Sequence, residues 1–200
     1  MKLASTARSA GTCGMRRLLL LLVLLCALPA LAQAQGQAAD RRAMLDRLLA
    51  ALKAAPSEQE AAPLEEKIRQ MWVTAGTPAV TLLMSRGLRE LKADANSDAI
   101  EDFSAAITLD PTAAEAYHQR AIARFSSGDA QGAVADIQAA LQHEPRNFAA
   151  FQTLSAIAEA RKDWKGAYDA WQKVMELDPK TPGGEERLKD LKRRALGEEA

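Results

Sequence analysis

Cysteine and histidine are scarce in this chain, and their scarcity excludes several kinds of site. Cys13 and Cys26 are the two cysteines, and both fall near the amino terminus. The two histidines, His118 and His143, are too far apart for the short ligand spacings of a metal site such as HExxH. Gly-rich phosphate loops and the GxSxG motif of hydrolases are absent as well. The sequence therefore predicts no catalytic residue, no metal and no cofactor, and we do not expect an enzyme.

Long apolar runs are limited to one, near the amino terminus. The stretch "MRRLLLLLVLLCALPALAQAQ" combines two arginines, a short apolar core and then small residues around a proline, which is the pattern of a secretory signal peptide. The apolar core is well short of the roughly 20 residues that span a bilayer. We therefore expect cleavage near Ala32 or Ala34 and no stable membrane insertion afterwards. The prediction is an exported, periplasmic protein with a signal peptide over residues 1–32 and a flexible segment over 33–39.

An excess of positive charge is also lacking once the signal peptide is set aside. Four of the 26 Lys and Arg lie in residues 1–32, which leaves 22 of them against 26 Asp and Glu. A net negative chain is a poor match for nucleic acid, so we expect no nucleic-acid partner. Both cysteines are removed with the signal peptide, so no disulfide is expected. The remaining residues, about 168, suffice for one domain with a continuous core.

What the chain does contain is an internal repeat of 34 residues. Pro111, Pro145 and Pro179 are spaced by 34, and each ends a helical pattern because proline disfavours helix in the residue before it. Small and large residues recur in register between the prolines: Ala99, Ala133 and Ala167, then Phe103, Ile137 and Trp171. Polar turns such as "SSGDAQG" divide each unit into two helices. One helix pair cannot cover its own apolar face, so we expect the units to stack into a solenoid.

These features resemble the tetratricopeptide repeat (TPR) family, whose 34-residue unit carries large residues at positions 4 and 24, small ones at 8 and 20, and proline at 32. Three units agree at these positions within residues 78–181: about 80–113, 114–147 and 148–181. The resemblance implies an all-α fold, a right-handed superhelix of antiparallel helix hairpins. The flanking segments fit this architecture, because residues 40–77 predict a degenerate helical hairpin and residues 182–200 a capping helix and tail.

The first two units depart from the family pattern at position 7, where leucine is usual. Arg86 and Arg120 stand there, whereas the third unit has Leu154. Sixteen residues later the distribution is the same: Asp102, Asp136 and then Ala170. Positions 7 and 23 lie at similar heights on antiparallel helices, so the sequence predicts a structural Arg–Asp ion pair in each of the first two units. The alternative is that the arginines also contact a ligand. Arg124 has no arginine counterpart in the other units and stays unexplained by the repeat.

In proteins of this family, the first helix of each unit lines a concave groove that holds a peptide or helix of a partner. The resemblance places six candidate contacts there: Met84, Leu88, His118, Ile122, Phe125 and Gln152. The Lys and Asn residues with which some members bind a chaperone's terminal carboxylate are missing from these positions. An open alternative is that the N-terminal hairpin fills the groove, because large exposed apolar patches are uncommon.

The sequence thus predicts a noncatalytic adaptor or scaffold of the bacterial cell envelope, with a protein or peptide as its partner. Two alternatives remain beside it. One is a structural or self-associating module with an occluded groove, and the other is an accessory subunit of an envelope enzyme or transport complex. No particular oligomeric state is predicted.

Overall fold

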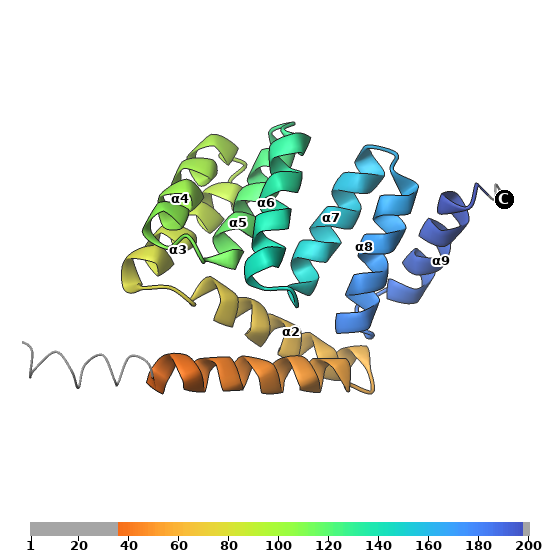
Figure 1. The fold of residues 1–200 in the computed structure, drawn as a ribbon, viewed down its shortest axis with the longest axis horizontal. Helices are drawn as coiled ribbons and strands as arrows, with labels where there is room; N and C mark the ends of the chain where they lie inside the picture. The colour runs from red at the N-terminus through yellow and green to blue at the C-terminus, as the bar shows by residue number, and fades with distance from the viewer. Residues whose placement is uncertain (1–35, 198–200) are drawn as a thin grey trace, which may run out of the picture. The chain divides into compact units, whose positions relative to one another are not determined.

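The computed structural model describes residues 36–197 of the chain (Figure 1). The chain divides into two units, Met1–Asp46 and Arg47–Ala200. In the first unit residues 36–46 are helical. The predicted flexible segment over 33–39 is therefore wrong for its last four residues, since alanine and glutamine favour helix. The predicted signal peptide and its cleavage site lie outside the described residues.

The described part of the second unit contains helices and turns. Residues 47–53 are helical, and eight further helices follow: α2 (Glu58–Val73), α3 (Pro78–Lys92), α4 (Asn96–Leu109), α5 (Ala114–Ser126), α6 (Ala130–His143), α7 (Phe148–Ala160), α8 (Trp164–Leu177) and α9 (Gly184–Ala195). Helix α3 pairs with α4, α5 with α6 and α7 with α8, and α9 packs on α8. Contacts of α4 with α5 and of α6 with α7 stack the pairs, which confirms the predicted all-α architecture of hairpins. None of the described helices is long and apolar enough to cross a membrane.

The turns inside the hairpins follow from local sequence signals. Asp129 and Asp163 cap the amino ends of α6 and α8, where their carboxylates accept hydrogen bonds from the backbone N–H groups of Gly132 (2.8 Å) and Gly166 (2.9 Å). Gly128 precedes the first of these caps with a φ of 87°, a conformation that glycine adopts without strain. The polar turns of the repeat therefore set where each second helix begins.

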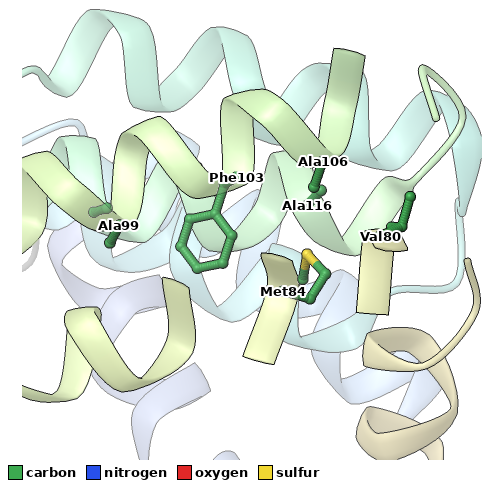
Figure 2. Packing of buried hydrophobic residues seen from close by; sticks show 7 residues of the cluster. Val80, Met84, Ala99, Phe103, Ala106 and Ala116 are labelled. Atoms are coloured by element: carbon green, nitrogen blue, oxygen red, sulfur yellow. The ribbon is translucent and has the colours of Figure 1, made fainter. Parts of the chain in front are cut away.

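Inside each hairpin a small residue on the first helix meets a large residue on the second. A Cβ on Gly87 of α3 would come within 2.7 Å of the Phe103 ring of α4. Phe103 is fully buried, and Figure 2 shows it within the cluster that it forms with Met84, Ala99 and Ala106. The second hairpin combines Ala121 with Ile137 in its core instead, both fully buried. Different pairs of sizes therefore fill the space between the helices at native density.

Helix α2 crosses the first helices of the repeat units. It contacts α3 and α5, and its Trp72 ring lies 5.3 Å from the ring of Phe148, the first residue of α7. Arg69, one turn earlier, places its guanidinium 4.8 Å from the centre of the same ring. Ile68 of α2 is fully buried, and Figure 1 shows the helix running past the ends of α3, α5 and α7. Helix α2 therefore covers part of the face that the first helices share.

Candidate partner-binding site

Arg120 forms the ion pair that the repeat pattern predicts. Its Nε and Nη2 donate to the two carboxylate oxygens of Asp136 at 2.9 and 2.7 Å, and both side chains are largely buried. Its Nη1 also donates to Ser104 Oγ of α4 at 3.0 Å. This bidentate geometry is the strong form of an arginine–carboxylate contact. Arg120 thus holds its own hairpin together and ties it to the preceding hairpin.

Arg124, which the repeat left unexplained, contacts the same aspartate. Its Nη1 lies 2.9 Å from Asp136 Oδ2, so two arginines one turn apart share one buried carboxylate. Sequence reasoning missed this contact because only the second unit carries the second arginine. The spacing of four residues between Arg120 and Arg124, which puts both on one helix face, was the available signal.

The first unit contains the other predicted pair, between Arg86 and Asp102. Its two partners differ in exposure, since the arginine side chain is 56% exposed and the aspartate side chain 2%. The third unit replaces the pair with Leu154, which packs against a buried apolar cluster. Each pair holds the two helices of its own hairpin together, so the geometry fits the structural interpretation.

Two of the predicted groove contacts are buried. Met84 is 2% exposed and belongs to the core cluster around Phe103, and His118 is 3% exposed. Met84 packs among residues of α3, α4 and α5, with Val73 of α2 against the same cluster, and the ring nitrogens of His118 face Glu115 and Thr153. The prediction that these two side chains contact a partner is therefore corrected. Gln152 is half-buried, and its amide donates to Thr181 Oγ1 at 3.1 Å.

Both ring nitrogens of His118 face polar partners in a buried network. Its Nδ1 lies 3.3 Å from Glu115 Oε1, and its Nε2 lies 3.0 Å from Thr153 Oγ1 of α7. The Glu115 carboxylate also accepts hydrogen bonds from Gln119 (2.6 Å) and Asn147 (3.2 Å). Burial alone would raise the pKa of Glu115, but the neighbouring His118 and these hydrogen bonds hold that pKa below its ordinary value. The network links α5 to α7 through buried, satisfied groups.

Glu115, His118 and Thr153 bring a carboxylate, an imidazole and a hydroxyl together, as in the catalytic triad of a hydrolase. Their geometry does not support nucleophilic catalysis. The Thr153 hydroxyl donates to the Ala149 carbonyl oxygen of its own helix at 3.1 Å, so its proton does not point to the imidazole. His118 and Glu115 are both buried. Residues 36–197 also hold no cluster of three His, Cys, Asp or Glu side chains suited to a metal ion. The arrangement is a structural network.

The remaining predicted groove contacts lie farther along the same helices and stay partly exposed. Leu88 of α3 and Ile122 and Phe125 of α5 are half-buried. Leu88 and Phe125 rest on the core clusters below them. Leu88, Ile122 and Phe125 are therefore the apolar residues of the predicted groove that keep part of their side chains exposed; we call these three residues the open groove.

The contact of α2 with the end of α8 places two carboxyl groups together. Asp178, the residue after α8, is fully buried, and its side chain faces Glu65 of α2. Burial raises the pKa of Asp178 to about 6, and Glu65 acts in the same direction, while the backbone N–H of Lys180 and the charge of Arg69 oppose them. Neither carboxylate oxygen of Asp178 makes a hydrogen bond of good geometry within the described residues. When protonated, the Asp178 carboxyl can donate a hydrogen bond to Glu65.

Antiparallel helix pairs that repeat every 34 residues, with the second helix of one pair packed on the first helix of the next, define an α-helical repeat solenoid. No protein-family model matches the chain. A TPR repeat-containing protein of Rhizobium etli is 27% identical over 153 residues, which cover 76% of this chain and 75% of that protein. The TPR domain of Sgt2 from Aspergillus fumigatus is 25% identical, with a TM-score of 0.56 over 60% of this chain and 81% of that domain.

The first TPR domain of Spaghetti (RPAP3), solved with the HSP90 peptide SRMEEVD, has a TM-score of 0.57 over 61% of this chain and 96% of that domain. Its identity of 20% shows the fold alone. Together with the 34-residue repeat and the hairpin geometry, these likenesses support a tetratricopeptide-repeat protein, and the fold is that of an all-α TPR superhelix. This is the fold of a protein–protein interaction module.

Proposed function

We propose that this chain is a noncatalytic adaptor of the bacterial cell envelope that binds a peptide or helix of a partner protein in its open groove. The observation that supports this function is the exposure of the concave face. Positions 9 and 12 of the first two units keep the apolar side chains Leu88, Ile122 and Phe125 partly exposed, whereas Met84 and His118 at position 5 are buried. Apolar residues on a concave face, rimmed by polar ones, are typical of a recognition surface.

The chemistry of the open groove favours an apolar segment as its ligand. The peptide bound to the RPAP3 domain is SRMEEVD, which carries three acidic residues. In this chain the corresponding groove positions hold Met84, Leu88, His118 and Ile122, and none of these is lysine or arginine. A helix or extended segment with apolar anchors therefore suits this groove better than an acidic tail.

Site-specific crosslinking in intact cells tests the proposal. A photoreactive amino acid replaces Ile122 in the groove or, as a control, Leu109, an exposed residue at the end of α4. We expect a discrete protein adduct from Ile122 and none from Leu109, identified by mass spectrometry. Replacing Ile122 and Phe125 by alanine should abolish capture of that protein and leave the melting temperature within a few degrees of wild type. Absence of an adduct at Ile122 would reject the groove as the binding site.

A second candidate is a structural module whose groove is occupied by its own α2, which the burial of Met84 and His118 favours. The two candidates differ in what the alanine substitutions do. If Ile122→Ala with Phe125→Ala lowers the melting temperature as strongly as it lowers capture, these side chains belong to the core. The adaptor proposal would then give way to the structural one.

The location in the envelope is supported by the signal-peptide pattern in residues 1–32 and by the bacterial source of the Rhizobium etli relative. Mass spectrometry of the protein from fractionated cells measures its amino terminus. We expect a periplasmic protein that begins at Gln33 or Gln35. An intact Met1 in the cytoplasmic fraction would contradict export.

A further inference from the structure

Within residues 36–197, the outer face of α3, at the start of the repeat series, is uncovered, unlike the same face of every later first helix. Positions 3 and 10 of a unit lie on this face. In the first unit Leu82 is 67% exposed and Arg89 is exposed as well. The residues at these positions in α5, α7 and α9 are all buried: Ala116, Ala123, Ala150, Ile157, Gly184 and Leu191. The later helices are covered by the second helix of the preceding hairpin, and α2 does not take this role for α3.

The arginine at position 7 is also more exposed in the first unit than in the second. Arg120 has a side chain that is 14% exposed and donates a hydrogen bond to Ser104 of the preceding hairpin. Arg86 pairs within its own hairpin, but no earlier hairpin covers it, and its side chain is 56% exposed. Arg89 forms no ion pair with any residue in the described part of the chain. Leu82, Arg86 and Arg89 follow one another at i, i+4 and i+7, so they share one face of the helix; we call them the α3 stacking face.

We propose that the α3 stacking face binds an acidic amphipathic helix of a partner protein, which takes the place of a preceding second helix and extends the solenoid by one layer. Charge decides against a second copy of this chain, because two such faces in contact would gather the Arg86 and Arg89 side chains of both copies in one interface. Leu82 projects where the later units have alanine or glycine. The partner helix therefore needs a small residue opposite Leu82 and a carboxylate opposite Arg89, because Arg86 already pairs with Asp102. This surface is separate from the open groove, so the inference goes beyond the proposed function.

Helix α4 is the template for a probe, because it covers the equivalent face of α5. The two helices are packed together, and Ser104 in the middle of α4 meets Arg120 in the middle of α5. Helix α4 carries three acidic residues and neither lysine nor arginine. Since α4 and α5 are antiparallel, Ile107 lies toward position 3 of α5 and Ile100 toward position 10.

The probe is a fluorescent peptide of residues 96–109, held helical by a hydrocarbon staple on the side that faces away. Ile107→Ala in the peptide supplies the small residue opposite Leu82, and Ile100→Glu supplies a carboxylate opposite Arg89. A control peptide carries Ile100→Lys instead. Fluorescence anisotropy measures the binding of each peptide to the full chain.

We expect saturable binding of the probe that weakens at least tenfold with Leu82→Asp and with Arg89→Glu, and that falls as salt is raised. The control peptide should bind at least tenfold more weakly. Leu109→Asp in the full chain changes a leucine that is 59% exposed elsewhere and should leave binding unchanged. All these positions are exposed, and thermal melting monitored by circular dichroism checks that each variant is folded.

Three results would overturn the proposal. The first is no saturable binding of the probe up to the solubility limit of the protein. The second is equal binding by wild type and Leu82→Asp, or by the probe and the control peptide. The third is a dimer in sedimentation velocity that Leu82→Asp dissociates, because the face would then belong to a second copy of the chain.

Discussion

At the residue scale, the arginines show what a comparison of repeat copies reveals. The pairing of Arg120 with Asp136 was predictable because arginine and aspartate occur together in two units and are both replaced in the third. The contact of Arg124 with the same carboxylate could not be predicted in this way, because only the second unit has an arginine at that position. The family resemblance places His118 in the groove because of its position in the repeat. That position identifies the helix face on which His118 lies, but it does not show which residues cover the face. Its partner Thr153 is 35 residues away.

Arg86→Leu is expected to destabilise the protein more than Arg120→Leu does. Removal of Arg86 leaves Asp102, which is 1% exposed, without a counter-charge, and a stranded buried charge costs about 3 to 5 kcal/mol. Removal of Arg120 leaves Asp136 paired with Arg124 at 2.9 Å, so we expect a loss of about 1 to 2 kcal/mol. Urea denaturation measures the two free energies of unfolding. Equal losses would mean that Arg124 does not compensate.

The third unit supplies the control for this prediction. It carries Leu154 and Ala170 where the first unit carries Arg86 and Asp102. Combining Arg86→Leu with Asp102→Ala reproduces that arrangement, and we expect most of the stability to return because no buried charge remains. A double variant as unstable as Arg86→Leu alone would show that the loss comes from packing.

At the element scale, the existence of α2 was predictable but its position was not. The capping signal at its start is present in the structure, where Ser57 Oγ accepts a hydrogen bond from the Glu60 N–H at 3.4 Å. The apolar stripe of the helix predicts that one face is buried, but it does not predict which other helices pack against that face. The face of α2 that covers Phe148 and approaches Asp178 uses charged and aromatic residues as well as the stripe. Helix α2 lies outside the 34-residue repeat, so the spacing of the repeat does not predict these contacts.

Asp178→Asn is expected to stabilise the protein increasingly as pH rises. The pKa of Asp178, about 6, lies above its ordinary value of 3.8. A raised pKa stabilises the folded state fully below about pH 4, and this contribution is lost as pH rises through about 6. An asparagine amide can donate to Glu65 at every pH. The melting temperature of the variant relative to wild type should therefore increase between about pH 4.5 and pH 7.5.

Asp110→Asn is the matched control for the pH series. Asp110 occupies the same repeat position after α4, but its carboxylate already accepts hydrogen bonds from the Thr112 N–H (3.0 Å) and hydroxyl (2.7 Å). An amide there loses acceptor capacity, so no gain at neutral pH is expected. A constant difference between Asp178→Asn and wild type across the series would show that the pKa of Asp178 is not raised by burial beside Glu65.

At the scale of the whole second unit, α2 adds contacts that a repeat solenoid does not have. In a simple solenoid each unit is stabilised by its neighbours alone. Helix α2 contacts α3 and α5, and its Trp72 packs on Phe148 at the start of α7, so it joins first helices of three repeat units. The stacking of hairpins could be predicted from the repeat length. The coupling through α2 could not, because it depends on contacts between residues about 75 positions apart, such as those of Trp72 with Phe148.

Trp72→Ala is expected to loosen all three first helices together. Trp72 is 7% exposed, and truncating a buried tryptophan costs about 3 to 5 kcal/mol. We expect the lower end, because its Nε1 is buried with no hydrogen-bond partner in the described residues. Hydrogen exchange followed by mass spectrometry should show faster exchange in α3, α5 and α7 as well as in α2. Trp164→Ala is the control, since this half-buried tryptophan of α8 lies against Arg194 at 4.8 Å and its loss should affect α8 and α9 only. If Trp72→Ala speeds exchange in α2 and leaves the first helices protected, α2 does not couple the repeat units.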